Sequence, residues 1–321
     1  MKTNSVDIVL PTYNGGAYLS KQIESVVGQT FTDWSLLIRD DGSSDATADV
    51  IRNYADTDGR ICIISDDQGK LGAVQNFSCL LRHTRADYVM LCDQDDVWLQ
   101  DKIQKSLDHM RKMEKASPGL PILVHSDLRV VDSSLKIIAP SFRKFQCLDP
   151  ENSGKIGRLL VQNVAVGCTM IMNRSLVKLS LPIPDSALMH DWWIALVACA
   201  MGRVGYIDEP TVLYRQHGSN TLGGRRYDMS RILERFHSSA QVLSDLLGTI
   251  YQAGDFLKAY GESMDKRDYN TVYRYSTVLR RARIMRLFDI VRYGFYKSGF
   301  LRNMATAWAL LSLPGSERVP R

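Results

Sequence analysis

Three carboxylates that follow an apolar run are the residues of this chain best suited to chemistry. The run Tyr88–Cys92 has the character of a buried strand, and Asp93, Asp95 and Asp96 come directly after it. In an open α/β sheet, acids at the carboxyl end of a strand lie where such folds bind their ligands. Carboxylates spaced Asp-x-Asp suit a Mg²⁺-type ion that also holds substrate phosphates. The alternative is an ordinary strand-to-helix turn, in which Asp96 caps a helix that begins at Val97.

Two further polar segments follow strand-like runs near the start of the chain. Pro-Thr-Tyr-Asn at 11–14 comes after the run 6–10, and Asp-Asp-Gly-Ser at 40–43 comes after the run 34–39. Because both follow strands, both are expected at the edge of the sheet where the carboxylates lie. A turn that leads into a capped helix is the alternative for the second segment. One acid is enough for a cap, so the doubled acid favours a functional role.

A His-Asp-Trp-Trp sequence at 190–193 places a carboxylate at the start of an expected helix, 191–201. Asp191 could act as a general base near an acceptor, or it could only cap that helix. The adjacent Trp192 and Trp193 favour the functional interpretation, because indoles are costly to expose and often form an apolar floor for sugars. One of the two could instead be plain core.

The elements that must position these residues alternate between strand and helix patterns. Strands are expected at 6–10, 34–39, 61–64 and 88–92, and helices at 17–29, 44–54 and 74–83. After residue 120 the order loosens, and strands are expected at 125–131, 168–172 and 205–214, the last interrupted by Pro210. The predicted fold class is therefore α/β, with a mostly parallel central sheet and flanking helices.

These motifs, in this order, resemble the signatures of family 2 glycosyltransferases with the Rossmann-like GT-A fold. The segments that carry the resemblance are Pro-Thr-Tyr-Asn at 11–14, Gln-Thr-Phe at 29–31, Asp-Asp-Gly-Ser-Ser-Asp at 40–45, Asp-Gln-Asp-Asp at 93–96 and His-Asp-Trp-Trp at 190–193. Each is common alone, but five in order are hard to obtain by chance. The resemblance covers roughly residues 5–222 and extends to bacterial rhamnosyltransferases that build O-antigen, capsule and other surface polysaccharides.

The resemblance implies roles for individual residues in the transfer of a sugar from a nucleotide diphosphate. Asp191 is implied as the base that takes the acceptor proton in a single, inverting displacement. Asp95 is implied as the direct metal ligand and Asp93 as a contact to the ribose or to a metal-bound water, with Mg²⁺ or Mn²⁺ as the cofactor. Thr12 and Tyr13 would flank the base, and Asp41 would bind the base or ribose. The full set expected around the nucleotide is Pro11, Thr12, Tyr13, Asn14, Asp41, Asn76 and Asp93.

Two later segments are expected near the sugars and the diphosphate. Gly167 and Cys168 follow small residues ahead of a strand, where a backbone can approach a sugar closely. Arg215 could pair with a phosphate, and His217 could be a second metal ligand, a diphosphate contact or a solvated loop residue. The residues expected on the acceptor and sugar side are His190, Trp192, Trp193, Gly167, Cys168 and Arg215.

The expected reaction adds one or a few sugars. The segment after residue 214 lacks the Gln-x-x-Arg-Trp signature that the family's processive synthases carry. By resemblance, the donor is expected to be dTDP-β-L-rhamnose and the acceptor a polyprenyl-diphosphate-linked glycan, with a UDP-hexose as the nearest alternative donor. Two rivals from other classes are a sugar nucleotidyltransferase and an inactive scaffold. The first would need a basic phosphate loop, but residues 11–16 contain no Lys or Arg.

Composition indicates a cytoplasmic protein with a basic tail. The six cysteines show no paired spacing, and neither a signal peptide nor an apolar stretch long enough to span a membrane is apparent. Residues 225–321 hold 17 Lys and Arg against 9 Asp and Glu, a net charge of +8. Residues 1–224 carry 23 against 26, a net charge of −3. The basic part is expected to meet something anionic.

The chain is expected to divide into a catalytic domain, residues 1–222, and a basic helical region, residues 223–321. Helical spacing at 232–259 and 269–300 predicts basic amphipathic surfaces that lie on an anionic membrane, so that the protein is peripheral to its inner face. A helical homodimer interface or a solvated face is the alternative. Nucleic-acid binding is not expected, because the chain has no base-reading module.

Overall fold

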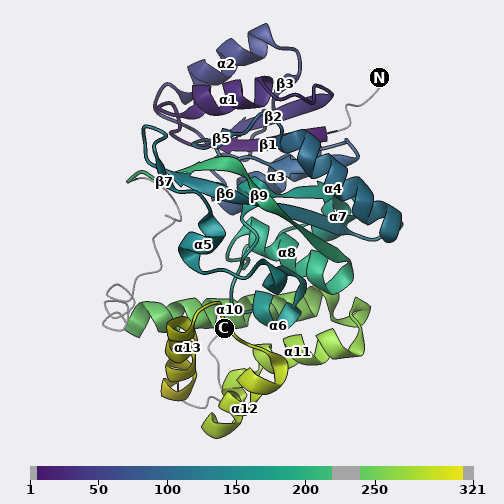
Figure 1. The fold of residues 1–321 in the computed structure, drawn as a ribbon, viewed down its shortest axis with the longest axis vertical. Coiled ribbons are helices and arrows are strands. Elements are labelled where there is room, and N and C mark those ends of the chain that lie inside the picture. Colours follow the sequence, from purple (N-terminus) through teal and green to yellow (C-terminus); the bar gives the residue numbers. More distant parts are fainter. Residues whose placement is uncertain (1–5, 219–238, 314–321) are drawn as a thin grey trace.

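The computed structural model describes residues 6–218 and 239–313, which form one α/β body with a layer of helices against it (Figure 1). A nine-stranded sheet runs through the middle in the order β3-β2-β1-β4-β8-β6-β9-β5, with β7 paired to β6. The strands are β1 Val6–Thr12, β2 Trp34–Asp40, β3 Ile61–Ile63, β4 Tyr88–Leu91, β5 Val97–Trp98, β6 Ile122–Val131, β7 Ile137–Ala139, β8 Ile171–Asn173 and β9 Arg203–Arg215.

The sheet is mostly parallel, as the alternating pattern predicts. Strand β1 is parallel to both β2 and β4, β2 is parallel to β3, and β6 is parallel to β9. The short strand β8 runs antiparallel to β4 and to β6. Thr12 lies opposite Asp40 and Val9 lies opposite Leu91, so the carboxyl ends of three neighbouring strands share one edge. This edge brings together the polar segments that follow β1, β2 and β4.

Helices cover both faces of the sheet because strand residues alternate in direction. Ile8 and Leu10 of β1 point into one apolar cluster with α1 and α4, whereas Val9 points into a second cluster with α3 and α8. The helices before the tail are α1 Leu19–Val27, α2 Thr47–Thr57, α3 Gly72–His83, α4 Lys102–Ala116, α5 Phe142–Gln146, α6 Ile156–Leu159, α7 Arg174–Ser180 and α8 His190–Met201.

Three expectations about secondary structure are wrong. The strand expected at 168–172 begins only at Ile171, because Gly167–Thr169 forms a 3₁₀ turn. Pro210 does not interrupt the last strand, since β9 runs through it with a shift of register against β6 near Asp127. No helix begins at Val97, because Val97 and Trp98 pair with β9 as strand β5.

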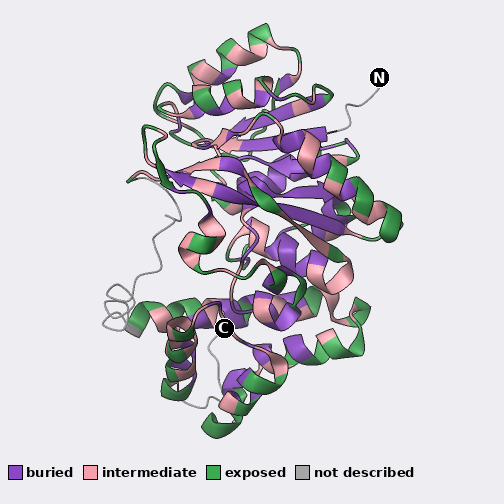
Figure 2. Cartoon of the chain, in the orientation of Figure 1, coloured by how far each residue is buried: buried purple, intermediate pink, exposed green. Residues whose placement is uncertain are grey.

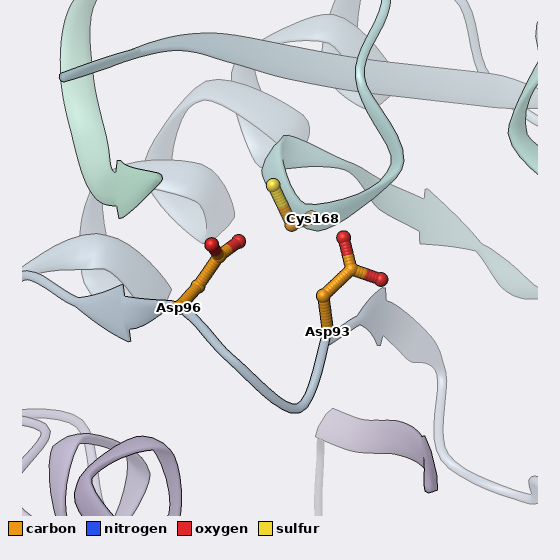
Figure 3. A group of neighbouring side chains, drawn as sticks. All are labelled: Asp93, Asp96 and Cys168. Atoms are coloured by element: carbon orange, nitrogen blue, oxygen red, sulfur yellow. The ribbon is translucent and has the colours of Figure 1, made fainter. Parts of the chain in front are cut away.

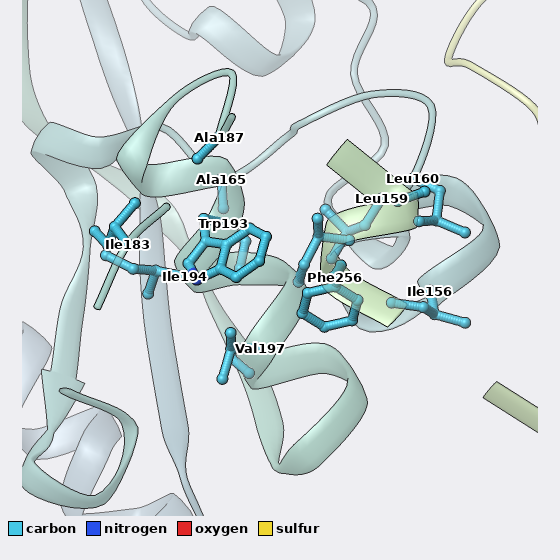
Figure 4. Close-up of a cluster of buried hydrophobic side chains, with 14 of the residues drawn as sticks. Ile156, Leu159, Leu160, Ala165, Ile183, Ala187, Trp193, Ile194, Val197 and Phe256 are labelled. Carbon is cyan, nitrogen blue, oxygen red and sulfur yellow. The ribbon is translucent and has the colours of Figure 1, made fainter. Parts of the chain in front are cut away.

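The tail helices pack directly on the α/β body. They are α10 Ser239–Tyr260, α11 Lys266–Ser276, α12 Arg283–Tyr293 and α13 Phe300–Ser312. The rings of Trp193 in α8 and Phe256 in α10 pack edge to face, with 5.4 Å between their centres. Both belong to one buried apolar cluster (Figure 4). The boundary expected between residues 222 and 223 and the start of the helix expected at 232 lie outside the described residues. Among the described helices, none combines the length and the hydropathy that a membrane-spanning segment needs.

Candidate active site

The acids after β4 lie in a loop that is held by the end of β9. Asp96 is fully buried, and its Oδ1 accepts a hydrogen bond from the backbone N–H of Arg215 at 3.1 Å. The expected alternative role of Asp96 as a helix cap is therefore wrong, because the following residues form β5. Arg215 also donates from Nε to the carbonyl oxygen of Asp95 at 2.7 Å and from Nη1 to the carbonyl oxygen of Ser133 at 2.6 Å. These bonds fix the loop in place.

Arg215 itself is a positioning residue and not an exposed phosphate contact. Its side chain is 2% exposed, and its guanidinium lies 4.7 Å from the centre of the Tyr18 ring. The sequence-based expectation that Arg215 pairs with a phosphate is corrected on this point, because the side chain is buried and its Nε and Nη1 donate to the carbonyl oxygens of Asp95 and Ser133.

Asp93, Asp96 and Cys168 form a cluster that could hold a metal ion (Figure 3). One ligand atom from each of them lies within 4.8 Å of the other two, and the two carboxyl groups extend from the same loop toward the thiol. Burial and the nearby charges of Asp95 and Asp191 raise the pKa of Asp93 to about 7. Burial and the charges of Asp95 and Asp93 raise the pKa of Asp96 well above its ordinary value. Such a concentration of like charge fits a divalent cation, which would relieve the repulsion.

The hydrogen-bonding state of these groups supports the same interpretation. The Oδ2 atom of Asp96 is buried and accepts no hydrogen bond from a described residue. Carboxylate oxygens are the ligands that Mg²⁺ and Mn²⁺ prefer, whereas the thiol of Cys168 is a softer ligand. Cys168 is fully buried, so it lies beneath the acids and does not face a sugar, contrary to the expectation from the sequence.

Asp95 lies beside His217, as two expected metal ligands should. The Nε2 atom of His217 is 2.8 Å from Oδ2 of Asp95, and both side chains are largely but not fully covered. The imidazole ring also lies 4.6 Å from the ring of Tyr18, measured between centres. His217 is thus held against the acidic loop and is not a solvated loop residue.

A buried lysine near this loop was not anticipated from the sequence. Lys102, at the start of α4, is fully buried, and its Nζ lies 3.5 Å from Oγ1 of Thr211. Burial lowers its pKa to about 8, while the neighbouring Cys168, Cys92 and Asp96 act in the opposite direction. The side chain therefore places a positive charge under the acids. No local pattern marks it, since a Lys in the first turn of a helix is normally solvated.

The expected base and the expected metal site are neighbours, because Asp191 contacts Gly167 and the adjacent Cys168 lies in the cluster with Asp93 and Asp96. Oδ2 of Asp191 accepts a hydrogen bond from the backbone N–H of Gly167 at 2.9 Å, whereas its buried Oδ1 has no hydrogen-bond partner among the described residues. Burial raises the pKa of Asp191 to about 6. A carboxyl group with this pKa can accept a proton near neutral pH.

Gly167 lies against Asp191, the expected base. A Cβ atom at this position would come within 3.3 Å of both Cβ of Asp191 and Nε2 of His190. The missing side chain therefore allows the loop to approach α8 and to donate its N–H to Asp191. The expected close approach exists, but its partner is the carboxylate.

The residues around Asp191 are more deeply buried than a sugar-binding surface would be. His190 is 3% exposed and stacks on the ring of Phe77 at 3.7 Å, and burial lowers its pKa to about 3. Trp193 is 1% exposed and packs against Phe256, so its expected role as a sugar contact is wrong. Trp192 is half-buried and donates from Nε1 to the carbonyl oxygen of Leu159 at 2.6 Å. Of this group, Trp192 alone keeps a substantial exposed surface.

Around the expected nucleotide site, Tyr13 and Asn14 are the exposed residues. Tyr13 is 42% exposed, and Nζ of Lys70 lies 3.7 Å from its ring centre. Pro11 and Thr12 are the last residues of β1, and Thr12 is buried with its hydroxyl donating to Oδ1 of Asp40 at 2.9 Å. The side chain of Thr12 therefore supports the turn and does not flank a base. Lys70 is a further basic residue near the site that the motifs did not indicate.

The loop after β1 is tied to the two other loops at the same edge. Gln94, between the two acids of the Asp-x-Asp pair, accepts from the N–H of Tyr13 at 2.9 Å and donates to its carbonyl oxygen at 3.0 Å. Asn14 has a left-handed backbone with φ of 49°, and its Oδ1 accepts from the N–H of Ser44 at 2.9 Å. The three polar segments expected to meet at this edge are thus joined by hydrogen bonds.

Asp41 and Asn76 are placed near each other through Arg39. Asp41 is 3% exposed and accepts hydrogen bonds from the N–H groups of Leu71 and Gly72, both at 2.7 Å, and from Arg39 at 2.8 Å. Asn76 is 2% exposed and donates to the carbonyl oxygen of Arg39 at 3.3 Å. Its buried Oδ1 has no partner among the residues described. Asp41 therefore holds the loop before α3 in place.

Comparison with known proteins supplies a family for this arrangement. A family model described as glycosyl transferase family 2 matches residues 7–179. The dTDP-rhamnosyl transferase RfbG of Shigella flexneri is 28% identical over 226 residues, which are 67% of this chain and 73% of that protein. The UDP-Glc:alpha-D-GlcNAc-diphosphoundecaprenol beta-1,3-glucosyltransferase WfgD of Escherichia coli is 25% identical over 176 residues, which are 54% of this chain and 61% of that protein.

Solved structures of glycosyltransferases share the fold. S. aureus TarS 1–349 in complex with UDP-GlcNAc superposes with a TM-score of 0.53 at 12% identity, over 90% of this chain and 89% of that one. The mannosyltransferase PcManGT from Pyrobaculum calidifontis, in complex with GDP-Man and Mn²⁺, superposes with a TM-score of 0.53 at 14% identity. The superposition covers 97% of this chain and 85% of that one. These likenesses confirm the expected GT-A fold with additional C-terminal helices.

Proposed function

Because this chain belongs to glycosyl transferase family 2, we propose that it transfers one L-rhamnose from dTDP-β-L-rhamnose, with inversion, onto a lipid-linked glycan in the synthesis of a surface polysaccharide. The family match covers the strands and loops that carry the acidic cluster. It also favours sugar transfer over the two rival classes, a sugar nucleotidyltransferase and an inactive scaffold.

The observation that carries the proposed mechanism is the placement of Asp191 beside the acidic loop. Oδ2 of Asp191 accepts from the N–H of Gly167 at 2.9 Å, and the next residue, Cys168, lies in the cluster with Asp93 and Asp96. Burial also raises the pKa of Asp191 to about 6. An acceptor hydroxyl beside Asp191 could give its proton to the carboxylate as the oxygen attacks the anomeric carbon. The glycosidic bond to the diphosphate breaks on the opposite side of the sugar, so a single displacement inverts the configuration.

The acidic loop is proposed to bind the metal ion that neutralises the leaving diphosphate. Asp93, Asp95 and Asp96 would hold Mg²⁺ or Mn²⁺ with help from His217, and Arg215 keeps their loop in position. The bound ion would supply positive charge to the diphosphate as it leaves. Tyr13 is proposed to stack on the base, because it is exposed and lies under the cation of Lys70.

The donor assignment is supported by the relatives. RfbG is named as a dTDP-rhamnosyl transferase and aligns with 67% of this chain. A UDP-hexose is the second candidate, because WfgD is named as a UDP-Glc-dependent enzyme and TarS was crystallised with UDP-GlcNAc. The name of WfgD also contains a diphosphoundecaprenol-linked acceptor, which supports the proposal of a lipid-linked glycan at the inner face of the membrane.

Calorimetric titration of the full-length protein tests the donor. The protein is titrated with dTDP-β-L-rhamnose, UDP-glucose, UDP-GlcNAc and GDP-mannose, each with Mn²⁺ and with EDTA. The proposal requires the dTDP sugar to bind most tightly and to lose affinity in EDTA. Tighter binding of a UDP sugar would replace rhamnose with a hexose, and equal binding in EDTA would remove the metal from donor recognition.

A further inference from the structure

Helix α12 lies at the outside of the tail, and much of it is exposed (Figure 2). Ile284, Phe288 and Val291 are 71%, 57% and 69% exposed in the described part of the chain, and their spacing places them on one side of the helix. The opposite side contains Arg286 and Ile290, which are buried against the rest of the tail. Three large apolar side chains with such exposure on one helix face are unusual in a soluble monomer.

Helix α13 repeats the arrangement. Phe300, Met304, Trp308 and Leu311 are 74%, 50%, 39% and 37% exposed, at a spacing that again selects one side of the helix. The two helices are fastened together by Arg286, whose Nη1 donates to the carbonyl oxygens of Leu310 at 2.6 Å and Leu313 at 2.8 Å. We call the seven exposed side chains the apolar surface of α12 and α13: Ile284, Phe288, Val291, Phe300, Met304, Trp308 and Leu311.

The charged side chains that α12, α13 and the turns beside them show to solvent are of one sign. Residues 278–313 include seven Lys and Arg but a single acid, Asp289. Asp289 is 1% exposed and pairs with Arg281 at 2.8 Å, so it shows no negative charge to solvent. Arg280, Arg283 and Arg292 are exposed. Any partner that covers the apolar residues must therefore also accept positive charge.

We propose that the apolar surface of α12 and α13 docks on an anionic lipid bilayer. The apolar side chains would enter the boundary between headgroups and acyl chains, while the exposed arginines contact lipid phosphates. A second copy of the chain is a poorer partner, because a symmetric interface would bring the same positive segment against itself. The inference rests on the tail alone and does not depend on which sugar the enzyme transfers.

Point substitutions test this better than truncation. Tyr275, Val278, Leu279, Phe295 and Leu310 of the tail are buried in the same cluster as Trp193 of α8, so removing the tail would expose the core of the enzyme. The exposed residues can be changed without entering that cluster. The apolar variant is Ile284→Ser, Phe288→Ser, Val291→Ser and Phe300→Ser combined, and the basic variant is Arg280→Gln, Arg283→Gln and Arg292→Gln combined.

The first measurement is co-sedimentation of the full-length protein with vesicles of phosphatidylglycerol and phosphatidylcholine, or of phosphatidylcholine alone. The unaltered protein is expected to bind the anionic vesicles in preference. The apolar and the basic variants should each lose affinity by roughly tenfold to a hundredfold. Matched controls are Tyr269→Ser with Tyr273→Ser, which are exposed on α11, and Arg85→Gln, Lys112→Gln and Lys115→Gln on the catalytic part; both should bind as the unaltered protein does.

Trp308 provides a second measurement on the surface itself. It is 39% exposed, whereas Trp34, Trp98 and Trp193 are at most 2% exposed. Lipids brominated on the acyl chain should quench the fluorescence of the unaltered protein on binding, and Trp308→Phe should remove most of that quenching while vesicle binding persists. Quenching that survives in Trp308→Phe would place another part of the protein against the bilayer.

Two results would overturn the proposal. One is vesicle binding that the apolar variant and the basic variant both retain. The other is a dimer of the unaltered protein, seen by sedimentation velocity, that becomes a monomer in the apolar variant while vesicles bind neither form. That outcome would make the surface an interface between two copies. Nucleotide-sugar affinity, measured in parallel, reports separately on the transferase site.

Discussion

The Nε2 atom of His217 lies 2.8 Å from Oδ2 of Asp95, although 122 positions separate the two residues in the chain. The contact joins the loop after β9 to the loop after β4. Arg215, two residues before His217, holds the same loop through its side chain and its backbone. The acidic loop therefore depends on the end of β9 for its shape, and the two segments should act as one unit in donor binding.

Replacement of either partner is expected to weaken metal-dependent donor binding. Asp95→Asn should abolish the difference between titrations in Mn²⁺ and in EDTA, because it removes a carboxylate from the proposed site. His217→Ala should weaken donor binding by about 10- to 100-fold in Mn²⁺, the usual effect of losing a residue that orients a ligand. His83→Ala, on the exposed part of α3, is the control. Unchanged Mn²⁺ dependence in Asp95→Asn would exclude this residue from metal binding.

Asp191→Asn is expected to lower kcat by about 10²- to 10⁴-fold with little change in donor affinity, because the amide cannot accept the acceptor proton. Burial raises the pKa of Asp191 to about 6, so protonation at lower pH removes the base. The rate of the unaltered enzyme should thus fall about tenfold for each pH unit below about 6. Asp56→Asn on the exposed side of α2 should behave as the unaltered enzyme. A rate for Asp191→Asn near that of the unaltered enzyme would require a different base.

Gln94→Ala is expected to weaken donor binding without abolishing metal binding. The substitution removes both hydrogen bonds that tie Gln94 to the backbone of Tyr13, at 2.9 and 3.0 Å. Loss of two such bonds should cost about 1–3 kcal/mol, or roughly 5- to 150-fold in KM for the donor. Gln100→Ala, which removes an exposed side chain, is the matched control. Equal donor KM values for the two variants would show that the loop around Tyr13 does not need this tie.

Trp193→Ala is expected to lower the free energy of unfolding by about 3–5 kcal/mol, because it leaves a cavity beside Phe256 in the core. Urea denaturation followed by circular dichroism measures the change. The milder Trp193→Phe should keep the KM for the glycan acceptor. A raised acceptor KM in Trp193→Phe, with stability retained, would show that Trp193 contributes to acceptor binding after all.

The sequence by itself determined the fold class and the edge of the sheet at which the chemistry gathers. Alternating strand and helix periods depend on local spacing, and the ends of β1, β2 and β4 follow from where their apolar runs stop. Parallel pairing then brings those ends together. Asp93, Asp95 and Asp191 could be proposed as site residues for the same reason, since each lies at the border of an element that local pattern defines.

Only the tertiary structure decided what each of the neighbouring side chains contacts. Asp96 is buried with one oxygen on the N–H of Arg215, whereas Asp95 beside it lies against His217. Trp193 lies next to Trp192 but packs into the core beside Phe256. Cys168 and Lys102 come to lie near the acids without any motif that marks them. The direction of a side chain depends on what packs against its element, and that packing comes from residues far away in the sequence.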